Sequence, residues 1–169
     1  MTLRPLVTLR IALVLGLGLA LFFLSFFGDD GFNNMSQAEV TTVTSFLEKA
    51  APGPIYCPTA VAPLADTARY NQFPVTDIFS TAALAGQSPV TGNIANLIAN
   101  LARRTTGGRT PAYVVVTPGM LAYSQAYGIA TQGNFSTLRA ALARSPAWKL
   151  LVSRAGTVIY ELPPANTRR

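Results

Sequence analysis

The feature that most constrains this chain is an uninterrupted apolar run from Ile11 to Phe27, in which Ser25 is the only polar side chain. At ~1.5 Å per residue, a helix of this length reaches about 26 Å, just short of the ~30 Å hydrocarbon core of a bilayer. Apolar residues before the run can supply the difference. The run therefore predicts a single N-terminal transmembrane helix over residues 11–28.

The charges on either side of the run predict the orientation of the chain. Arg4 and Arg10 precede it, while Asp29 and Asp30 follow it, so the positive-inside rule places the N-terminus in the cytoplasm. A cleaved signal peptide is the alternative, but the run is long for one and no small-x-small cleavage site follows it. We therefore expect a single-pass cell-membrane protein, embedded in the lipid bilayer, whose C-terminal domain is extracytoplasmic.

Composition excludes several classes of chemistry. The chain has no histidine and only one cysteine, Cys57, so it cannot form a thiolate metal cluster, an intramolecular disulfide, or a Ser-His or Cys-His nucleophile pair. We expect no cofactor and no metal. The net charge of +6 comes from scattered arginines, which suit a solvated basic surface better than a lipid-headgroup site. No basic run is interleaved with aromatics, so we expect no nucleic-acid partner.

A folded domain is predicted to begin shortly after the apolar run. Ser36 and Glu39 have the spacing of a capping box, which starts a helix reaching about Ala50. Prolines then end that helix, and a short strand follows in which Cys57 is expected to be buried. The expected organisation is a cytoplasmic N-terminus at 1–10, a transmembrane helix at 11–28, a tether at 29–35, an extracytoplasmic α/β domain at 36–164 and a tail at 165–169.

The second half of the chain alternates helices and strands. Its expected elements are a helix capped by Asn93 and stopped at Gly107, an apolar central strand at 112–116, a helix capped by Thr117 with Pro118 at its first position, a helix capped by Ser136, and a hairpin of 148–152 and 157–162. Helices between strands imply crossover connections. The order therefore predicts an α/β fold, with a small three-layer domain, a mainly parallel sheet and a C-terminal antiparallel hairpin.

Residues 61–92 lack periodicity and are predicted to form a long loop. The loop holds Arg69, Tyr70 and Asn71, and this combination of cation, aromatic and amide suits a sugar or a phosphate. Thr117 and Gly119 would form the floor of the site, because backbone amides at the start of a helix can hold an anion. In the alternative interpretation, the aromatic side chains of the loop only anchor it to the core.

Several stretches together resemble a known family. They are GFNNMS at 31–36, APGP at 51–54, SPAWKL at 145–150 and TVIY at 157–160. In this arrangement the chain is similar to the C-terminal region of bacterial multi-pass membrane glycosyltransferases that use polyprenyl-phosphate sugars, namely the last membrane helix and an extracytoplasmic tail domain. The catalytic acid of that family lies in an early loop between the first membrane helices. This sequence has no such loop, so the resemblance supplies no catalytic residue.

Two functions follow as expectations. The first is a non-catalytic accessory or partner-binding module of envelope glycan or lipid-linked sugar assembly, working beside a multi-pass membrane protein. The second is a fragment or subunit of a glycosyltransferase whose long loop binds a polyprenyl-phosphate-linked sugar or the acceptor. We favour the first, with any catalytic acid on another chain. A carboxylate enzyme is a weaker third interpretation, because Asp66, Asp77 and Glu161 show no pairing by spacing.

Overall fold

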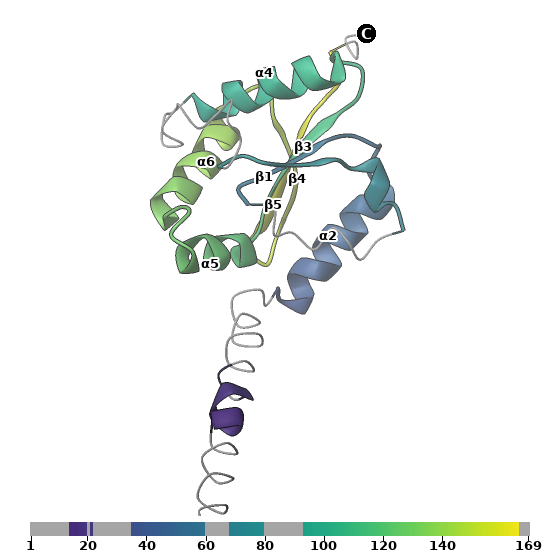
Figure 1. Cartoon of the computed structure of the whole chain (residues 1–169). Coiled ribbons are helices and arrows are strands. Elements are labelled where there is room, and N and C mark those ends of the chain that lie inside the picture. Colours follow the sequence, from purple (N-terminus) through teal and green to yellow (C-terminus); the bar gives the residue numbers. More distant parts are fainter. Residues whose placement is uncertain (1–13, 20, 22–34, 60–67, 80–92, 166–169) are drawn as a thin grey trace, which may run out of the picture. The chain divides into compact units, whose positions relative to one another are not determined.

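The structure is a computed structural model that describes residues 14–19, 21, 35–59, 68–79 and 93–165. The chain divides into two compact units, Met1–Asn34 and Met35–Arg169. The elements of the second unit are α2 (Gln37–Lys49), β1 (Ile55–Cys57), the 3₁₀-helix η2 (Tyr70–Gln72), β2 (Val75–Asp77), α4 (Ile94–Thr106), β3 (Ala112–Val116), α5 (Pro118–Ala126), α6 (Gln132–Arg144), β4 (Lys149–Arg154) and β5 (Thr157–Leu162) (Figure 1).

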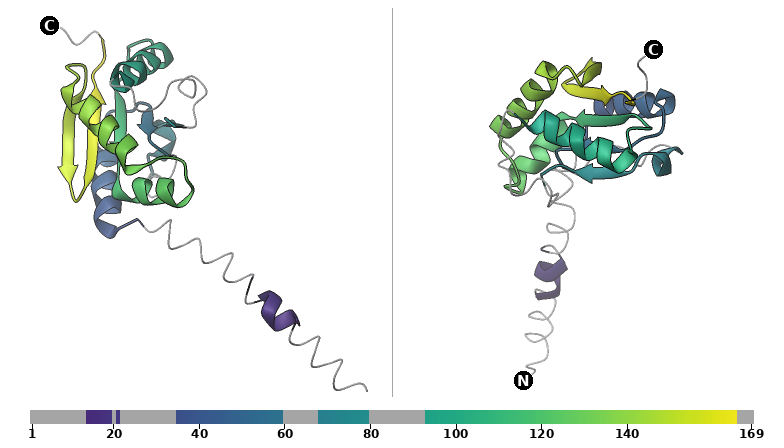
Figure 2. Two further views of the ribbon diagram at one scale, coloured as in Figure 1. Left: turned by 90° about the vertical axis from the view of Figure 1, so that its left-hand side faces the viewer. Right: turned by 90° about the horizontal axis from the view of Figure 1, so that it is seen from above.

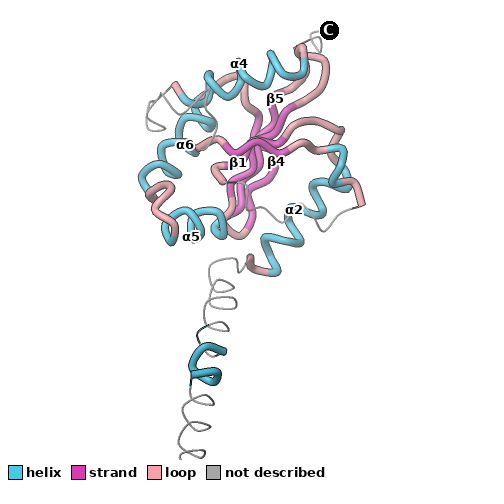
Figure 3. The backbone as a smooth tube through the Cα atoms, viewed as in Figure 1, coloured by secondary structure: helices cyan, strands magenta, loops and turns pink. Residues whose placement is uncertain are grey.

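The second unit is built on one five-stranded sheet with the order β2-β1-β3-β5-β4. Figure 3 shows the strands in magenta at the centre of this unit, with helices around them. β1 runs parallel to both β2 and β3. β3 and β4 each run antiparallel to β5. All five residues of β3 are buried, as expected for a strand with a neighbour on each side and helices over both faces.

Helices cover both faces of this sheet. α2 lies on one face, and α4, α5 and α6 lie on the other, as the two orthogonal views agree (Figures 1 and 2). On the α2 side, the ring of Phe46 packs edge-to-face on Tyr113 of β3, with centroids 5.0 Å apart. On the opposite side, the indole N–H of Trp148 donates to the carbonyl of Ala95 in α4 over 3.0 Å. The α/β class is therefore confirmed, with the core on both sides of β3.

The prediction of a mainly parallel sheet was wrong, because the sheet is mixed. The parallel strands β1 and β2 have only three residues each. β5 instead pairs with all five residues of β3, from Ala112 opposite Leu162 to Val116 opposite Val158. The C-terminal antiparallel hairpin is confirmed. Its strands β4 and β5, with six residues each, are longer than the parallel strands and make up a larger part of the sheet than was expected.

The predicted N-terminal transmembrane helix is also corrected. Within the residues that the structure describes, no helix is long and apolar enough to cross a membrane. Of the predicted span at 11–28, the structure describes helix at 14–19 and at 21. The rest of the predicted span lies outside the described residues.

The described part of the predicted long loop contains regular secondary structure. Residues 68–79 hold η2 and the edge strand β2, while 60–67 and 80–92 lie outside the described residues. Phe73 and Ile78 are each only 1% exposed and join the core. Pro74 concealed β2 from sequence analysis, although proline is tolerated at the start of an edge strand. The anchoring role proposed for the loop aromatics is thus confirmed for Phe73.

Helix boundaries were predicted well where a cap is local. The capping box of Ser36 and Glu39 is present, Thr117 caps α5 ahead of Pro118, and Gly107 ends α4 in the left-handed conformation. One cap was wrong, because α6 begins after Thr131, whose side chain forms a capping box with Asn134, and not at Ser136. Asn93 occupies the N-cap position of α4 as predicted, but its side chain makes no capping hydrogen bond.

Candidate functional site

Arg69, the central residue of the predicted ligand site, is bound to the end of α2. Its Nη1 donates to the carbonyl oxygens of Leu47 and Glu48, each over 2.8 Å, and its Nη2 donates to that of Ala50 over 3.0 Å. The guanidinium also lies 5.5 Å from the centroid of the Phe73 ring. The last carbonyls of a helix lack intrahelical donors and carry partial negative charge, so a guanidinium stabilises them. Arg69 therefore acts as a C-terminal cap for α2.

The other two residues of the predicted loop site lie in η2. Tyr70 is 45% exposed, and Asn71 is also exposed. Gln72, next in this 3₁₀-helix, accepts a hydrogen bond from Nε of Arg69 over 3.0 Å. The loop thus presents Tyr70 and Asn71 to solvent while Arg69 turns toward α2.

At the predicted floor of the site, the anion position is filled by the chain's own carboxylate. Oε1 of Glu39 accepts from the N–H of Gly119 over 2.6 Å, and Oε2 accepts from the N–H of Ser36 over 2.8 Å. A Cβ at position 119 would lie 3.1 Å from Oε1, so glycine permits this close approach. Thr117 meanwhile accepts from the N–H of Met120 as the cap of α5. One carboxylate therefore joins the first turns of α2 and α5.

Glu39 is only 3% exposed, and its surroundings keep it ionised. Burial by itself raises the pKa of the carboxyl. The hydrogen bonds from Gly119 and Ser36 outweigh that effect and lower the pKa below the usual value of 4.5. A carboxylate with a lowered pKa and filled acceptor positions is a poor general acid or base near neutral pH. The role of Glu39 is structural.

The structure does not bring the two halves of the predicted site together. Glu39 and Gly119 meet at the first turn of α2, whereas Arg69 binds carbonyls of its last turn. About eight residues separate these turns, which corresponds to about 12 Å along the helix axis. Thr117 and Gly119 therefore cannot form the floor of a single small site around Arg69.

A different site, which sequence analysis missed, lies between α2 and the β4–β5 hairpin. It is a groove with a volume of about 480 Å³, hereafter the hairpin groove. Small-molecule and side-chain pockets commonly enclose about 300–1,000 Å³, so this groove is large enough for recognition. Its lining residues come from α2, β3 and the hairpin, and they are Thr42, Ser45, Phe46, Lys49, Ala50, Ala51, Tyr113, Leu151, Val152, Arg154 and Glu161.

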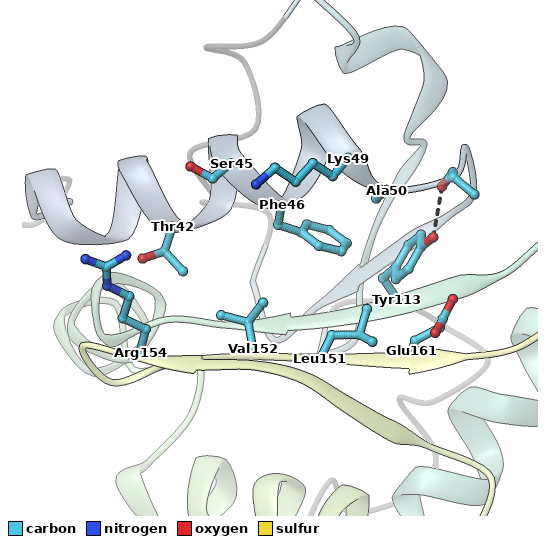
Figure 4. A pocket seen from close by; sticks show the side chains of 11 residues that line it. Thr42, Ser45, Phe46, Lys49, Ala50, Tyr113, Leu151, Val152, Arg154 and Glu161 are labelled. Atoms are coloured by element: carbon cyan, nitrogen blue, oxygen red, sulfur yellow. Dashed lines mark hydrogen bonds between the residues drawn. The ribbon is translucent and has the colours of Figure 1, made fainter.

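The two ends of the hairpin groove differ in charge. Figure 4 shows Arg154 and Thr42 at one end, with Ser45 and Lys49 along the α2 rim (Figure 4). Phe46, Leu151 and Val152 line the middle, and Glu161 lies at the opposite end. No ion pair joins these side chains within the described part of the chain. The groove therefore has a cationic end, an apolar middle and a single carboxylate beyond it.

Tyr113 in the groove and Cys57 in β1 both hold their protons. The hydroxyl of Tyr113 donates to the carbonyl of Ala51 over 2.9 Å. Burial, reinforced by the charge of Glu161, raises the pKa of Tyr113 to about 12, so the hydroxyl stays protonated. Burial likewise raises the pKa of the Cys57 thiol, which keeps it from acting as a nucleophile. Among the described residues there is also no cluster of three potential metal ligands.

A second hollow lies where β3 leads into α5. Thr117 and Pro118 line it together with Ser136 and Arg139 of α6, and its volume is about 150 Å³. This is below the usual range for ligand pockets. The hairpin groove is therefore the better candidate for a binding site.

Comparisons with protein-family models, with curated proteins and with solved structures found no match for this chain. The resemblance to membrane glycosyltransferases stays a prediction.

Proposed function

We propose that this domain is a non-catalytic binding module of cell-envelope assembly, which uses the hairpin groove to hold a multi-pass membrane partner. The groove carries the proposal, because an aromatic and aliphatic middle with Arg154 at one end and Lys49 along the α2 rim combines apolar burial with charge recognition. Among the described residues that line the groove, Glu161 is the only one with a carboxylate. Paired acids of the glycosidase kind need two such groups about 5–10 Å apart.

The alternative of a loop that binds a polyprenyl-phosphate sugar receives less support. The donors of Arg69 that would bind a phosphate contact the carbonyls of Leu47, Glu48 and Ala50 instead. The amide of Gly119 likewise contacts Glu39. A ligand at either place would have to displace a contact that stabilises α2.

Site-specific photo-crosslinking in bacterial cells tests the proposal. A photoreactive amino acid in place of Val152, in the middle of the groove, should yield a product that contains a multi-pass envelope protein. The same probe in place of Ile129, which is 41% exposed between α5 and α6, should not. Equal products at both positions, or none at position 152, would overturn the proposal. Loss of the product with Arg154→Glu would tie the partner to the groove itself.

Location outside the cytoplasm is a separate proposal, supported by the charges around the apolar run. Arg4 and Arg10 lie before it, and Asp29 and Asp30 lie after it. Protease added to intact spheroplasts should digest the chain after residue 28. Complete protection, with digestion only after lysis, would place the domain in the cytoplasm instead.

A further inference from the structure

β4 forms one edge of the sheet. β4 pairs with β5 and, in the part of the chain that the structure describes, with no other strand. It has six residues, of which only Val152 is half-buried while the others are exposed. Leu150 and Leu151 are 50% and 38% exposed. A long edge with exposed aliphatic side chains is a template for pairing with a further strand.

We propose that the partner binds as an extended segment added alongside β4, with an acidic side chain beside Arg154 and an apolar side chain beside Val152. This inference rests on the proposed function and names the mode of binding. Strand addition draws affinity from main-chain hydrogen bonds and specificity from pockets that take alternate side chains. The hairpin groove is such a pocket, and it lies directly beside this edge.

The spacing of the groove residues sets the pattern of the partner. Val152 and Arg154 are two residues apart in β4, and both line the groove. Side chains two residues apart in a strand lie on one face, about 6.6–7 Å from each other. Two alternate side chains of an added strand would therefore reach the apolar middle and the cationic end. The matching pattern is an acidic residue, any residue, and an apolar residue, in the order set by strand direction.

The charges of the groove favour one register of that segment. Arg154 favours an acid at the cationic end, where the hydroxyl of Thr42 also lies, and Lys49 adds positive charge along the α2 rim (Figure 4). A slip along β4 toward the other end would bring the acid close to Glu161, which repels it, although Lys149 opposite Glu161 offsets part of this repulsion. The placement beside Arg154, away from Glu161, is therefore the more favourable one.

A second copy of this chain is a less suitable occupant. Antiparallel pairing of two β4 strands about their midpoint would set Lys149 of each copy opposite Arg154 of the other. Like charges directly opposite in a sheet are destabilising. The same cations attract an acidic segment, so the edge is open to such a partner while disfavouring its own copy.

Binding of synthetic peptides to the purified full-length chain tests this inference. The probes are fluorescent seven-residue β-forming peptides with acid-x-apolar, base-x-apolar or uncharged patterns in both sequence directions. Fluorescence anisotropy should show the tightest binding for an acid-x-apolar peptide. Arg154→Glu should weaken it roughly tenfold or more, Arg154→Lys should retain most of it, and Arg109→Glu, at an exposed position outside the groove, should leave it unchanged.

Methylation of the peptide backbone distinguishes strand addition from side-chain binding alone. In a strand, alternate N–H groups point to opposite edges, so N-methylation of one alternate set should abolish binding and that of the other should spare it. Equal affinity for both methylated peptides would reject strand addition and leave the groove proposal standing. No preference for acid-x-apolar peptides, or no binding of any peptide, would reject the inference. Crosslinking at position 152 would still decide the proposed function.

Discussion

The two ends of α2 are held by opposite charges in different surroundings. At its first turn, the buried carboxylate of Glu39 accepts from the N–H groups of Ser36 and Gly119. At its last turn, the half-buried guanidinium of Arg69 donates to carbonyls that include those of Leu47 and Ala50. Each charge complements the helix dipole. Because hydrogen bonds to a buried charge are costlier to lose, we expect the first end to contribute more stability than the second.

The largest effect is expected from Glu39→Ala. It leaves the buried N–H of Gly119 without its acceptor, opens the capping box and separates α2 from α5. The free energy of unfolding should fall by about 3 kcal/mol, measured by urea denaturation of the full-length chain. Glu48→Ala, at an exposed position of the same helix, is the control and should change it by less than about 0.5 kcal/mol. Equal effects of the two changes would remove the distinction between Glu39 and an ordinary surface acid.

Arg69→Ala should have a smaller effect, of about 1–2 kcal/mol. The carbonyls it leaves at the end of α2 are partly accessible, and water can replace some of the lost hydrogen bonds. Arg69→Lys should recover part of the loss, because an ammonium group supplies the charge but not three donors in the required directions. Arg103→Ala, at the exposed last turn of α4, serves as the control. If Arg69→Ala destabilised the domain more than Glu39→Ala, the order proposed for the two ends would be reversed.

Ser36→Ala should have an effect of about 1 kcal/mol, typical of losing an N-cap side chain. The Ser36 hydroxyl accepts from the N–H of Glu39, but the Glu39 carboxylate keeps its bond to the N–H of residue 36. The variant should therefore retain the contact with Gly119. Hydrogen exchange of the Gly119 amide measures this directly, and it should stay protected in Ser36→Ala and become fast in Glu39→Ala.

Sequence analysis predicted the parts of the fold whose signals are close together in the chain. The capping box joins Ser36 and Glu39, which are three positions apart, and the caps at Thr117 and Gly107 are equally local. The contact of Glu39 with Gly119 joins residues 80 apart, and that of Arg69 with Leu47 joins residues 22 apart. Neither pairing is visible in the sequence, because it depends on which elements pack together.

The hairpin groove was missed for the same reason. Its lining comes from α2, β3 and the hairpin, and the groove exists only because β5 inserts beside β3 and leaves β4 at the edge. The strand itself was predicted, and its exposed leucines would have indicated an interaction surface once its edge position was known. Arg69 and Gly119 do bind polar groups, as was predicted from their chemistry. Those groups are the carbonyls at the end of α2 and the carboxylate of Glu39, which are parts of the domain itself and not of a ligand.

The smallest expected effect concerns pH, which should change the loss of unfolding free energy in Glu39→Ala but not the loss in Arg69→Ala. The folded state holds the pKa of Glu39 below its usual value of 4.5, so the folded state binds its proton less readily than the unfolded state. The stability that this ionised group contributes is fully present above pH 4.5 and is lost as the pH falls through the lower, folded-state pKa. The difference in unfolding free energy between the natural chain and Glu39→Ala should therefore narrow on acidification below pH 4.5. The corresponding difference for Arg69→Ala should stay constant, because the acceptors that Arg69 contacts at the end of α2 are backbone carbonyls and not carboxylates. Urea denaturation of the three proteins from pH 7 to pH 3 measures both differences. A Glu39→Ala difference that stayed constant over this range would mean that the carboxyl holds α5 equally well when protonated, and that its charge contributes nothing to this end of α2.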